Sequence, residues 1–266
     1  MSRLLCCILI GLIAPSQAIA QDSAQDLAKQ LANPIASLIS VPLQLNYDSG
    51  FGADGEGDRW TLNIQPVVPI ALNKEWNLIS RTILPVIAQD GVVTPGSDEF
   101  GLGDTVQSIF FSPREIGESG IIWGAGPAFV LPTATDHRLG GEKWGIGPTG
   151  VVLKQAGQIT YGVLANQIWS IAGADDRGDI SQLFVQPFIS YTNGNATTFG
   201  MNSEISYNWI SDQASIPINL TVSQLTAIGG QPVQIGGGAR VYLERPENGP
   251  DWGLRFNLTF LFPAGG

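Results

Sequence analysis

A single histidine, His137, could act as a general base, and it lies in the polar stretch Thr135-Asp-His-Arg-Leu-Gly-Gly141. A serine-type hydrolase needs a nucleophile within hydrogen-bond reach of such a base, and a third group that orients the base. No serine lies within two residues of His137, and the stretch has the composition of a loop. We therefore predict a solvated loop histidine and no enzyme. The alternative, a hydrolase of the phospholipase type, would need a serine from a distant part of the chain.

Metal-binding side chains are equally scarce. Both cysteines, Cys6 and Cys7, lie in the first ten residues, so carboxylates would have to bind any ion, and carboxylates suit hard ions such as calcium. The best candidate is Asp175-Asp176-Arg177-Gly178-Asp179, which matches no calcium-loop pattern. We expect an acidic solvated loop there, and neither a metal nor another cofactor.

The charge balance argues against nucleic acid as a partner. The chain has 13 basic and 23 acidic side chains and a formal net charge of -10. A protein that binds nucleic acid needs a basic face to neutralise phosphates, and no cluster of Lys and Arg occurs in this sequence.

Polar and apolar residues alternate along much of the chain. In the last such segment Trp252, Leu254 and Phe256 alternate with Gly253 and Arg255. A period of two indicates a β-strand with one apolar and one polar face. Twelve segments of this kind occur, near residues 38–48, 59–70, 75–88, 102–112, 121–131, 143–154, 159–171, 181–192, 197–210, 214–226, 232–243 and 251–262.

The number and length of these segments favour a membrane barrel. Twelve is even, as single-chain bacterial barrels require, and segments of this length can cross a bilayer as tilted strands. We therefore predict an all-β fold, a transmembrane antiparallel up-and-down barrel of about 12 strands, over a soluble β-sandwich. Alternation is poorer in the third and fourth segments, where Ile79, Arg81 and Ile83 share a face, and we expect a bulge near Asp104.

In such a barrel the polar face of each strand lines the lumen. These groups need water or one another, and pairs formed across the lumen, such as Glu204 with Asp104 or Arg81, would narrow or close a pore. The predicted lumen-lining residues are Gln44, Asn46, Asn63, Gln65, Arg81, Asp104, Gln186, Asn202, Glu204, Asn219, Arg240, Arg255 and Asn257.

The connections between segments alternate in length, long after odd-numbered segments and mostly short after even-numbered ones. Bacterial barrels keep long loops outside the cell and tight turns in the periplasm. The long loops are rich in acids, which predicts a negative outer vestibule that enriches cations or holds divalent ions against lipopolysaccharide, unless the acids only keep the loops soluble. The vestibule would contain Asp54, Glu56, Asp58, Asp98, Glu99, Asp175, Asp176, Asp179, Glu247 and Asp251.

All seven tryptophans lie near predicted strand ends, where amphipathic rings favour the headgroup level. They predict two aromatic girdles, an outer one and an inner one. The set is Trp60, Trp76, Trp123, Trp144, Trp169, Trp209 and Trp252.

The N-terminus predicts export. Arg3 precedes a short apolar run and the small residues Ala18-Ile19-Ala20, so residues 1–20 are a predicted signal peptide cleaved near Ala20. Residues 21–37 would be a periplasmic lead-in, with a short helix suggested by the spacing of Leu27, Ala28 and Leu31; a plug in the lumen is the alternative. Residues 38–266 would form the barrel. The expected location is the outer membrane of a Gram-negative bacterium, with lipid, lipopolysaccharide and the barrel-assembly machinery as partners.

Three stretches resemble one known family of outer-membrane barrels. They are Gly101-Leu-Gly-Asp-Thr-Val-Gln-Ser-Ile-Phe-Phe-Ser-Pro113, Trp123-Gly-Ala-Gly-Pro-Ala-Phe-Val-Leu-Pro-Thr-Ala-Thr-Asp136 and Glu142-Lys-Trp-Gly-Ile-Gly-Pro-Thr-Gly150. The family is called phenol meta-pathway degradation proteins, or simply transporters, and the similarity extends from about residue 33 to 262. The resemblance implies a barrel with a role in uptake.

These observations favour a channel or transporter for passive uptake of a small solute, with a preference for cations or for hydrophobic or aromatic compounds. The alternatives are the phospholipase-type enzyme and a closed barrel with a structural role.

Overall fold

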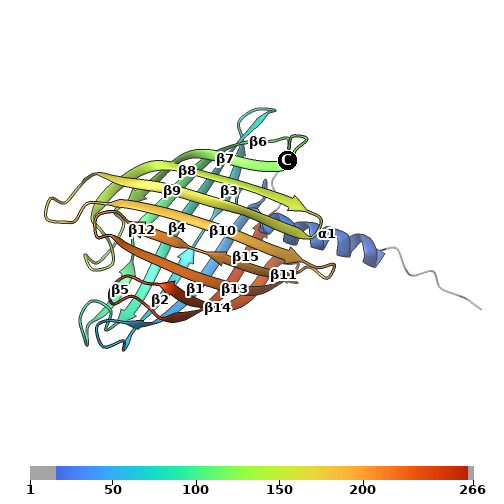
Figure 1. Cartoon of the computed structure of the whole chain (residues 1–266). Coiled ribbons are helices and arrows are strands. Elements are labelled where there is room, and N and C mark those ends of the chain that lie inside the picture. Colours follow the sequence, from blue (N-terminus) through green and yellow to red (C-terminus); the bar gives the residue numbers. More distant parts are fainter. Residues whose placement is uncertain (1–15, 263–266) are drawn as a thin grey trace, which may run out of the picture.

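A computed structural model describes residues 16–262 as one helix and one closed β-sheet (Figure 1). All strand pairings are antiparallel, and the pairing of β9 with β10 joins the two ends of the sheet. The elements are α1 (Ser16–Leu31), β1 (Ile39–Phe51), β2 (Gly57–Ile64), β3 (Val67–Ala71), β4 (Trp76–Asp90), β5 (Asp98–Leu102), β6 (Thr105–Pro113), β7 (Ile121–Leu131), β8 (Lys143–Ala156), β9 (Ile159–Gly173), β10 (Ser181–Thr192), β11 (Thr197–Ser203), β12 (Ile205–Asn208), β13 (Gln213–Ile228), β14 (Gln231–Glu244) and β15 (Trp252–Phe262).

These fifteen strand segments make up a twelve-stranded barrel, because three of the barrel strands are each interrupted once. β2 and β3 both lie between β1 and β4, β5 and β6 both pair with β4, and β11 and β12 both lie between β10 and β13. The predicted twelve-stranded antiparallel barrel is thus confirmed, as is the short N-terminal helix.

Each interruption falls at a polar residue that was predicted to line the lumen. Gln65 and Pro66 separate β2 from β3, Gly103 and Asp104 separate β5 from β6, and Glu204 separates β11 from β12. An irregularity of this kind bends a strand and changes the direction of a side chain. The bulge expected near Asp104 is therefore one of three, and all three redirect side chains that make long-range contacts.

The outer surface of the barrel is apolar. Leu220, Phe256 and Val241 are each about half exposed, and Phe100 is 78% exposed. A soluble protein would bury such a surface, whereas lipid tails can cover it. In the described part of the chain, no helix is long and apolar enough to cross a membrane.

Part of the interior is also apolar, which the sequence did not predict. A buried cluster on the inner wall includes Ile79 from β4, Phe110 from β6, Leu153 from β8 and Leu164 from β9. Ile35, from the segment between α1 and β1, packs into this cluster and is 4% exposed. This cluster explains the weak alternation of the predicted segment 75–88, because its strand, β4, is apolar on the lipid side and on most of the inner side.

The two ends of the barrel differ. Long connections gather at one end and short turns at the other, where α1 also lies (Figure 1). The turn between β13 and β14 consists of Gly229 and Gly230, with φ values of 60° and 84°. A two-residue hairpin of this twist needs positive φ at both positions, which glycine adopts without strain.

Candidate functional site in the barrel interior

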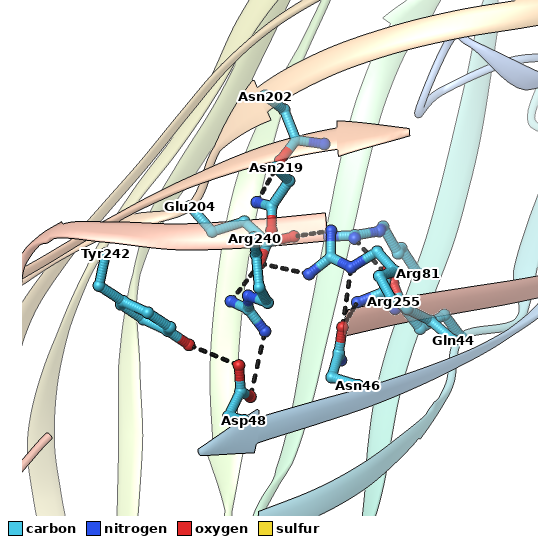
Figure 2. A network of polar contacts seen from close by, with 11 residues as sticks. Gln44, Asn46, Asp48, Arg81, Asn202, Glu204, Asn219, Arg240, Tyr242 and Arg255 are labelled. Atoms are coloured by element: carbon cyan, nitrogen blue, oxygen red, sulfur yellow. Dashed lines mark hydrogen bonds and ion pairs between the residues drawn. The ribbon is translucent and has the colours of Figure 1, made fainter. Parts of the chain in front are cut away.

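Four charged groups meet in the middle of the interior (Figure 2). The guanidinium of Arg255 donates two hydrogen bonds to the Glu204 carboxylate, at 2.9 and 2.8 Å. Arg240 donates to the same carboxylate at 3.4 Å and to Asp48 at 3.2 Å. Glu204 lies between β11 and β12, and β13 separates it from the strand of Arg240, while β13 and β14 separate it from the strand of Arg255. These contacts therefore run through the lumen and not between neighbouring strands.

Gly253 makes room for the second ion pair. On the inner face it lies directly between Asp48 of β1 and Arg240 of β14. A Cβ atom at Gly253 would stand 2.5 Å from Asp48 Oδ1 and 2.9 Å from Arg240 Cγ. The missing side chain therefore lets the two charged groups meet across β15. Tyr242 adds a hydrogen bond of 2.9 Å from its hydroxyl to Asp48.

Amide side chains surround the charged groups. Asn46 accepts a hydrogen bond from Arg255 at 2.8 Å, and Asn219 donates one of 2.8 Å to Asn202. Gln44 lies beside Asn63 on the inner face of β1 and β2. These amides and ion pairs form what we call the central network, which consists of Gln44, Asn46, Asp48, Asn202, Glu204, Asn219, Arg240, Tyr242 and Arg255.

A cavity of about 290 Å³ lies between the central network and α1. Gln44, Gln65, Arg81, Gln186 and Asn257 contribute polar groups to its lining. The opposite side is formed by α1 and the following segment, with the apolar side chains Ala28, Leu31, Ala36 and Leu38. The cavity therefore has one polar and one apolar wall.

Helix α1 covers the short-turn end of this cavity. Ala28 is fully buried against a cluster that includes Ala196, Leu225 and Leu261. The helix backbone is also tied to the barrel, because Gln155 donates a hydrogen bond of 2.8 Å to the carbonyl of Lys29. The expected periplasmic lead-in is thus packed across the mouth of the barrel, and the segment that follows it enters the lumen at Ile35.

A second polar group lies toward the long loops. Arg59 donates to Gln89 at 2.8 Å, Gln89 donates to Glu99 at 2.9 Å, and Glu99 forms an ion pair with Arg138 at 2.8 Å. This chain of contacts crosses from β2 to the loop after β7.

Sequence reasoning missed four residues of the interior, although the signal was present. Asp48 has the same parity as Asn46 in its strand, Arg59 the same as Asn63, and Tyr242 the same as Arg240. Gln89 has the parity of Arg81, but the isoleucines between them hide the pattern.

Asp104 lies apart from the central network. Its carboxylate accepts hydrogen bonds from the backbone N–H groups of Gly141 at 2.6 Å and Ala134 at 3.2 Å. The side chain therefore anchors the loop between β7 and β8. The contact with Glu204 that the sequence suggested is not formed, and Arg81 reaches Glu204 through no ion pair within residues 16–262.

Several of the acids assigned to the outer vestibule have basic or polar partners. Glu99 is paired with Arg138, Asp179 lies 3.3 Å from Lys143, and Asp251 lies 2.6 Å from Arg245. Hydrogen bonds from Ser170 and Lys143 lower the pKa of Asp179 below its ordinary value. Asp58 accepts a hydrogen bond from Tyr47, and Glu247 belongs to the last long loop. The remaining acids are exposed at loops or strand ends, namely Asp54, Glu56, Asp98, Asp175 and Asp176.

Six of the seven tryptophans are more than 40% exposed on the outer surface, at strand ends. Tyr47 packs its ring against Trp60 and Trp252 on the neighbouring strands, at centroid distances of 4.7 and 5.8 Å. Trp76 and Trp123 pack edge to face at the opposite end, at 5.9 Å. The exposed tryptophans are Trp60, Trp123, Trp144, Trp169, Trp209 and Trp252.

His137 is exposed, and its Nδ1 lies 3.4 Å from Asp136. Across the described residues no serine hydroxyl hydrogen-bonds to it, and no three His, Cys, Asp or Glu side chains gather as a metal site. The geometry gives neither a catalytic triad nor a metal centre in this part of the chain.

Comparison with solved structures finds outer-membrane proteins that are similar to this chain. An outer membrane channel from Pseudomonas putida F1 superposes with a TM-score of 0.64 and 15% identity, over 85% of this chain and 96% of that one. The outer membrane phospholipase of Salmonella typhi matches with a TM-score of 0.49 and 12% identity, over 88% of this chain and 98% of that one. No protein-family model matches the sequence, and neither does any curated protein.

Together the closed twelve-stranded sheet, the apolar outer surface and the aromatic rings at both ends define an outer-membrane β-barrel. The channel from Pseudomonas putida F1 is similar to this chain in fold, at 15% sequence identity.

Proposed function

We propose that this barrel is an outer-membrane channel for passive uptake of a small solute. The observation that supports this function is the interior cavity of about 290 Å³, one wall of which carries amide, hydroxyl and guanidinium groups. A barrel with only a structural role would be expected to pack its interior side chains against one another. Polar groups around a cavity are instead typical of a solute path.

The path is closed at two levels. Inside the lumen the central network joins Glu204 to Arg255, whose strands are separated by β13 and β14, and α1 covers the short-turn end at Ala28. A solute can therefore pass only when both barriers rearrange. This arrangement distinguishes the proposed channel from a wide porin, whose lumen stays open.

Two alternatives make different predictions. A closed structural barrel would use the central network as a permanent brace, and no solute would pass. A phospholipase-type enzyme would need His137 as its base, although the side chain is exposed and lies beside Asp136 alone. Release of fatty acid from lipid that is lost in the variant His137→Ala would overturn the channel proposal.

The outer loops and the interior make opposite predictions about charge selectivity. The acids of the vestibule favour cations at the mouth, as the sequence suggests. The interior contains three guanidinium groups, those of Arg81, Arg240 and Arg255, and two carboxylates, those of Asp48 and Glu204, and this excess of positive charge favours anions. Reversal potentials in a salt gradient separate the two, because the narrower region dominates selectivity.

We also infer export through a signal peptide, with cleavage near Ala20, and insertion by the barrel-assembly machinery into a membrane that contains lipopolysaccharide. Residues 1–15 of that peptide lie outside the described residues. N-terminal sequencing of the mature protein from outer-membrane fractions, with a heat-dependent gel shift as the sign of a folded barrel, tests these points.

Planar-bilayer recording of the refolded protein tests the channel itself. We expect small, discrete current steps of low open probability, because two barriers must open together. Complete absence of steps, in protein whose gel shift shows a folded barrel, would favour the closed structural barrel.

A further inference from the structure

Among the described residues Arg81 has no carboxylate within ion-pair distance, unlike Arg240 and Arg255 of the central network. Its side chain makes one hydrogen bond, from Nη2 to Gln65 Oε1 at 3.0 Å. Within residues 16–262 no acidic oxygen lies within 4 Å of it, whereas Arg240 and Arg255 share Glu204. A guanidinium carries five N–H donors, so most of those of Arg81 are available. The side chain lines the cavity between the central network and α1.

The balance of charge in the interior leaves room for one anion. Arg81, Arg240 and Arg255 face two carboxylates, those of Asp48 and Glu204, in the central region. Burying an unpaired charge is costly, so one bound monoanion would complete the set. A doubly charged phosphate would bring one negative charge more than the three guanidinium groups can balance.

The rest of the cavity wall indicates the chemistry of that anion. Beside Arg81 lie uncharged hydrogen-bonding groups such as Gln186 and Asn257. Ser190 also lines the cavity, and its hydroxyl is buried without a hydrogen-bond partner among the described residues. The facing wall, with Leu31 and Leu38, is apolar. One end of the ligand should therefore accept hydrogen bonds and the other end should be hydrocarbon.

We propose that this cavity binds a small monocarboxylate with an apolar body, whose carboxylate pairs with the guanidinium of Arg81. A guanidinium and a carboxylate fit one another through two parallel hydrogen bonds, and such charge-assisted bonds are stronger than neutral ones. The inference deepens the proposed channel function and relies on it for the route by which the solute arrives. Binding itself can be measured without transport.

Three aromatic probes of similar size and different charge test the site: benzoate, benzyl alcohol and benzylammonium. Equilibrium dialysis against the folded full-length barrel in detergent at neutral pH should show binding of benzoate in clear preference to the other two. The variant Arg81→Gln should weaken benzoate binding by about tenfold or more, because it removes a charged hydrogen-bond donor. Arg81→Lys keeps the charge and should keep the preference for benzoate.

Arg114→Gln is the matched control, since Arg114 lies in the exposed turn after β6 and donates to the carbonyl of Asn73. It should bind benzoate as the wild type does, and a heat-dependent gel shift should show that every variant is folded. Equal binding of benzoate and benzyl alcohol by the wild type would overturn the proposal. Unchanged benzoate binding by folded Arg81→Gln would overturn it as well.

Benzoate flux into proteoliposomes separates this site from the channel function. Binding that depends on Arg81, with no flux in any variant, would retain the site and refute the channel. Flux that is the same in wild type and Arg81→Gln, without measurable binding, would retain the channel and refute the site.

Discussion

Glu204 and Arg255, whose strands are separated by β13 and β14, form a bidentate ion pair inside the lumen with distances of 2.9 and 2.8 Å. Arg255 is 3% exposed. The variant Glu204→Gln would leave Arg255 and Arg240 without their shared carboxylate, and unpaired buried charge is strongly destabilising. We expect the free energy of unfolding, measured by urea titration in lipid vesicles, to fall by about 3 kcal/mol.

The double variant Glu204→Gln with Arg255→Gln removes the unpaired charge together with the pair. Its loss of unfolding free energy should be smaller than the sum of the losses in the two single variants, and a double-mutant cycle measures the difference as a coupling energy. Strict additivity would show that the two side chains do not interact in the folded barrel.

Gly253 should tolerate no side chain. In Gly253→Ala the new Cβ would collide with the backbone carbonyl of Tyr47 and with the side chains of Asp48 and Arg240, and overpacking of this kind costs about 1–3 kcal/mol. Gly237→Ala is the control, because its Cβ would find only an ordinary contact, 3.4 Å from the carbonyl of Arg255. Unfolding midpoints of the two variants decide the point, and equal midpoints would refute the close approach.

Asp104 should hold the loop between β7 and β8 against the barrel. Asp104→Ala removes two hydrogen bonds to backbone N–H groups, including that of Gly141 at 2.6 Å. Local opening should rise by about tenfold or more, which trypsin cleavage after Arg138 reports. Asp54→Ala, in a different loop, removes only a local contact to Glu56 and should leave that cleavage rate unchanged.

The same loop should respond to acid in a defined window. Hydrogen bonds from the side chain and backbone of Arg138 lower the pKa of Asp136 from 3.8 to about 2. Because the folded pKa lies below the unfolded value, the contact stabilises the loop above pH 3.8 and is lost as the pH falls toward about 2. A carboxyl carbon titration by NMR should give a midpoint near 2 in the wild type and a higher midpoint in Arg138→Gln, which loses the side-chain hydrogen bonds but keeps the backbone one. A wild-type midpoint near 3.8 would disagree.

The strands could be predicted because each strand has lipid on one face and the lumen on the other, so that apolar and polar residues alternate along it. In β15, Trp252, Leu254 and Phe256 face outward while Arg255 faces the lumen, and the sequence shows this directly. The method weakens where the interior is apolar. In β4 the inner face carries Ile79 beside Arg81, since the lumen there is filled by Ile35 from outside the strands.

The partners of the interior residues could not be predicted in the same way. Glu204 and Arg255 are separated by 51 residues in the sequence, and β13 and β14 lie between their strands in the sheet. Their meeting therefore depends on the curvature of the closed sheet. Period-two parity places each side chain on the inner face and says nothing about which opposite strand it reaches. Likewise, the spacing of Leu27, Ala28 and Leu31 predicts a helix but not its packing across the barrel mouth.

The most direct test of a solute path closed by α1 is single-channel recording of Ala28→Asp beside Gln30→Asp. Ala28 is fully buried between the helix and the barrel, whereas Gln30 is exposed on the same helix, so both variants add one negative charge and only the first should displace the helix. The account predicts a higher open probability for Ala28→Asp and wild-type behaviour for Gln30→Asp. Folded Ala28→Asp protein that stays as closed as the wild type would contradict it.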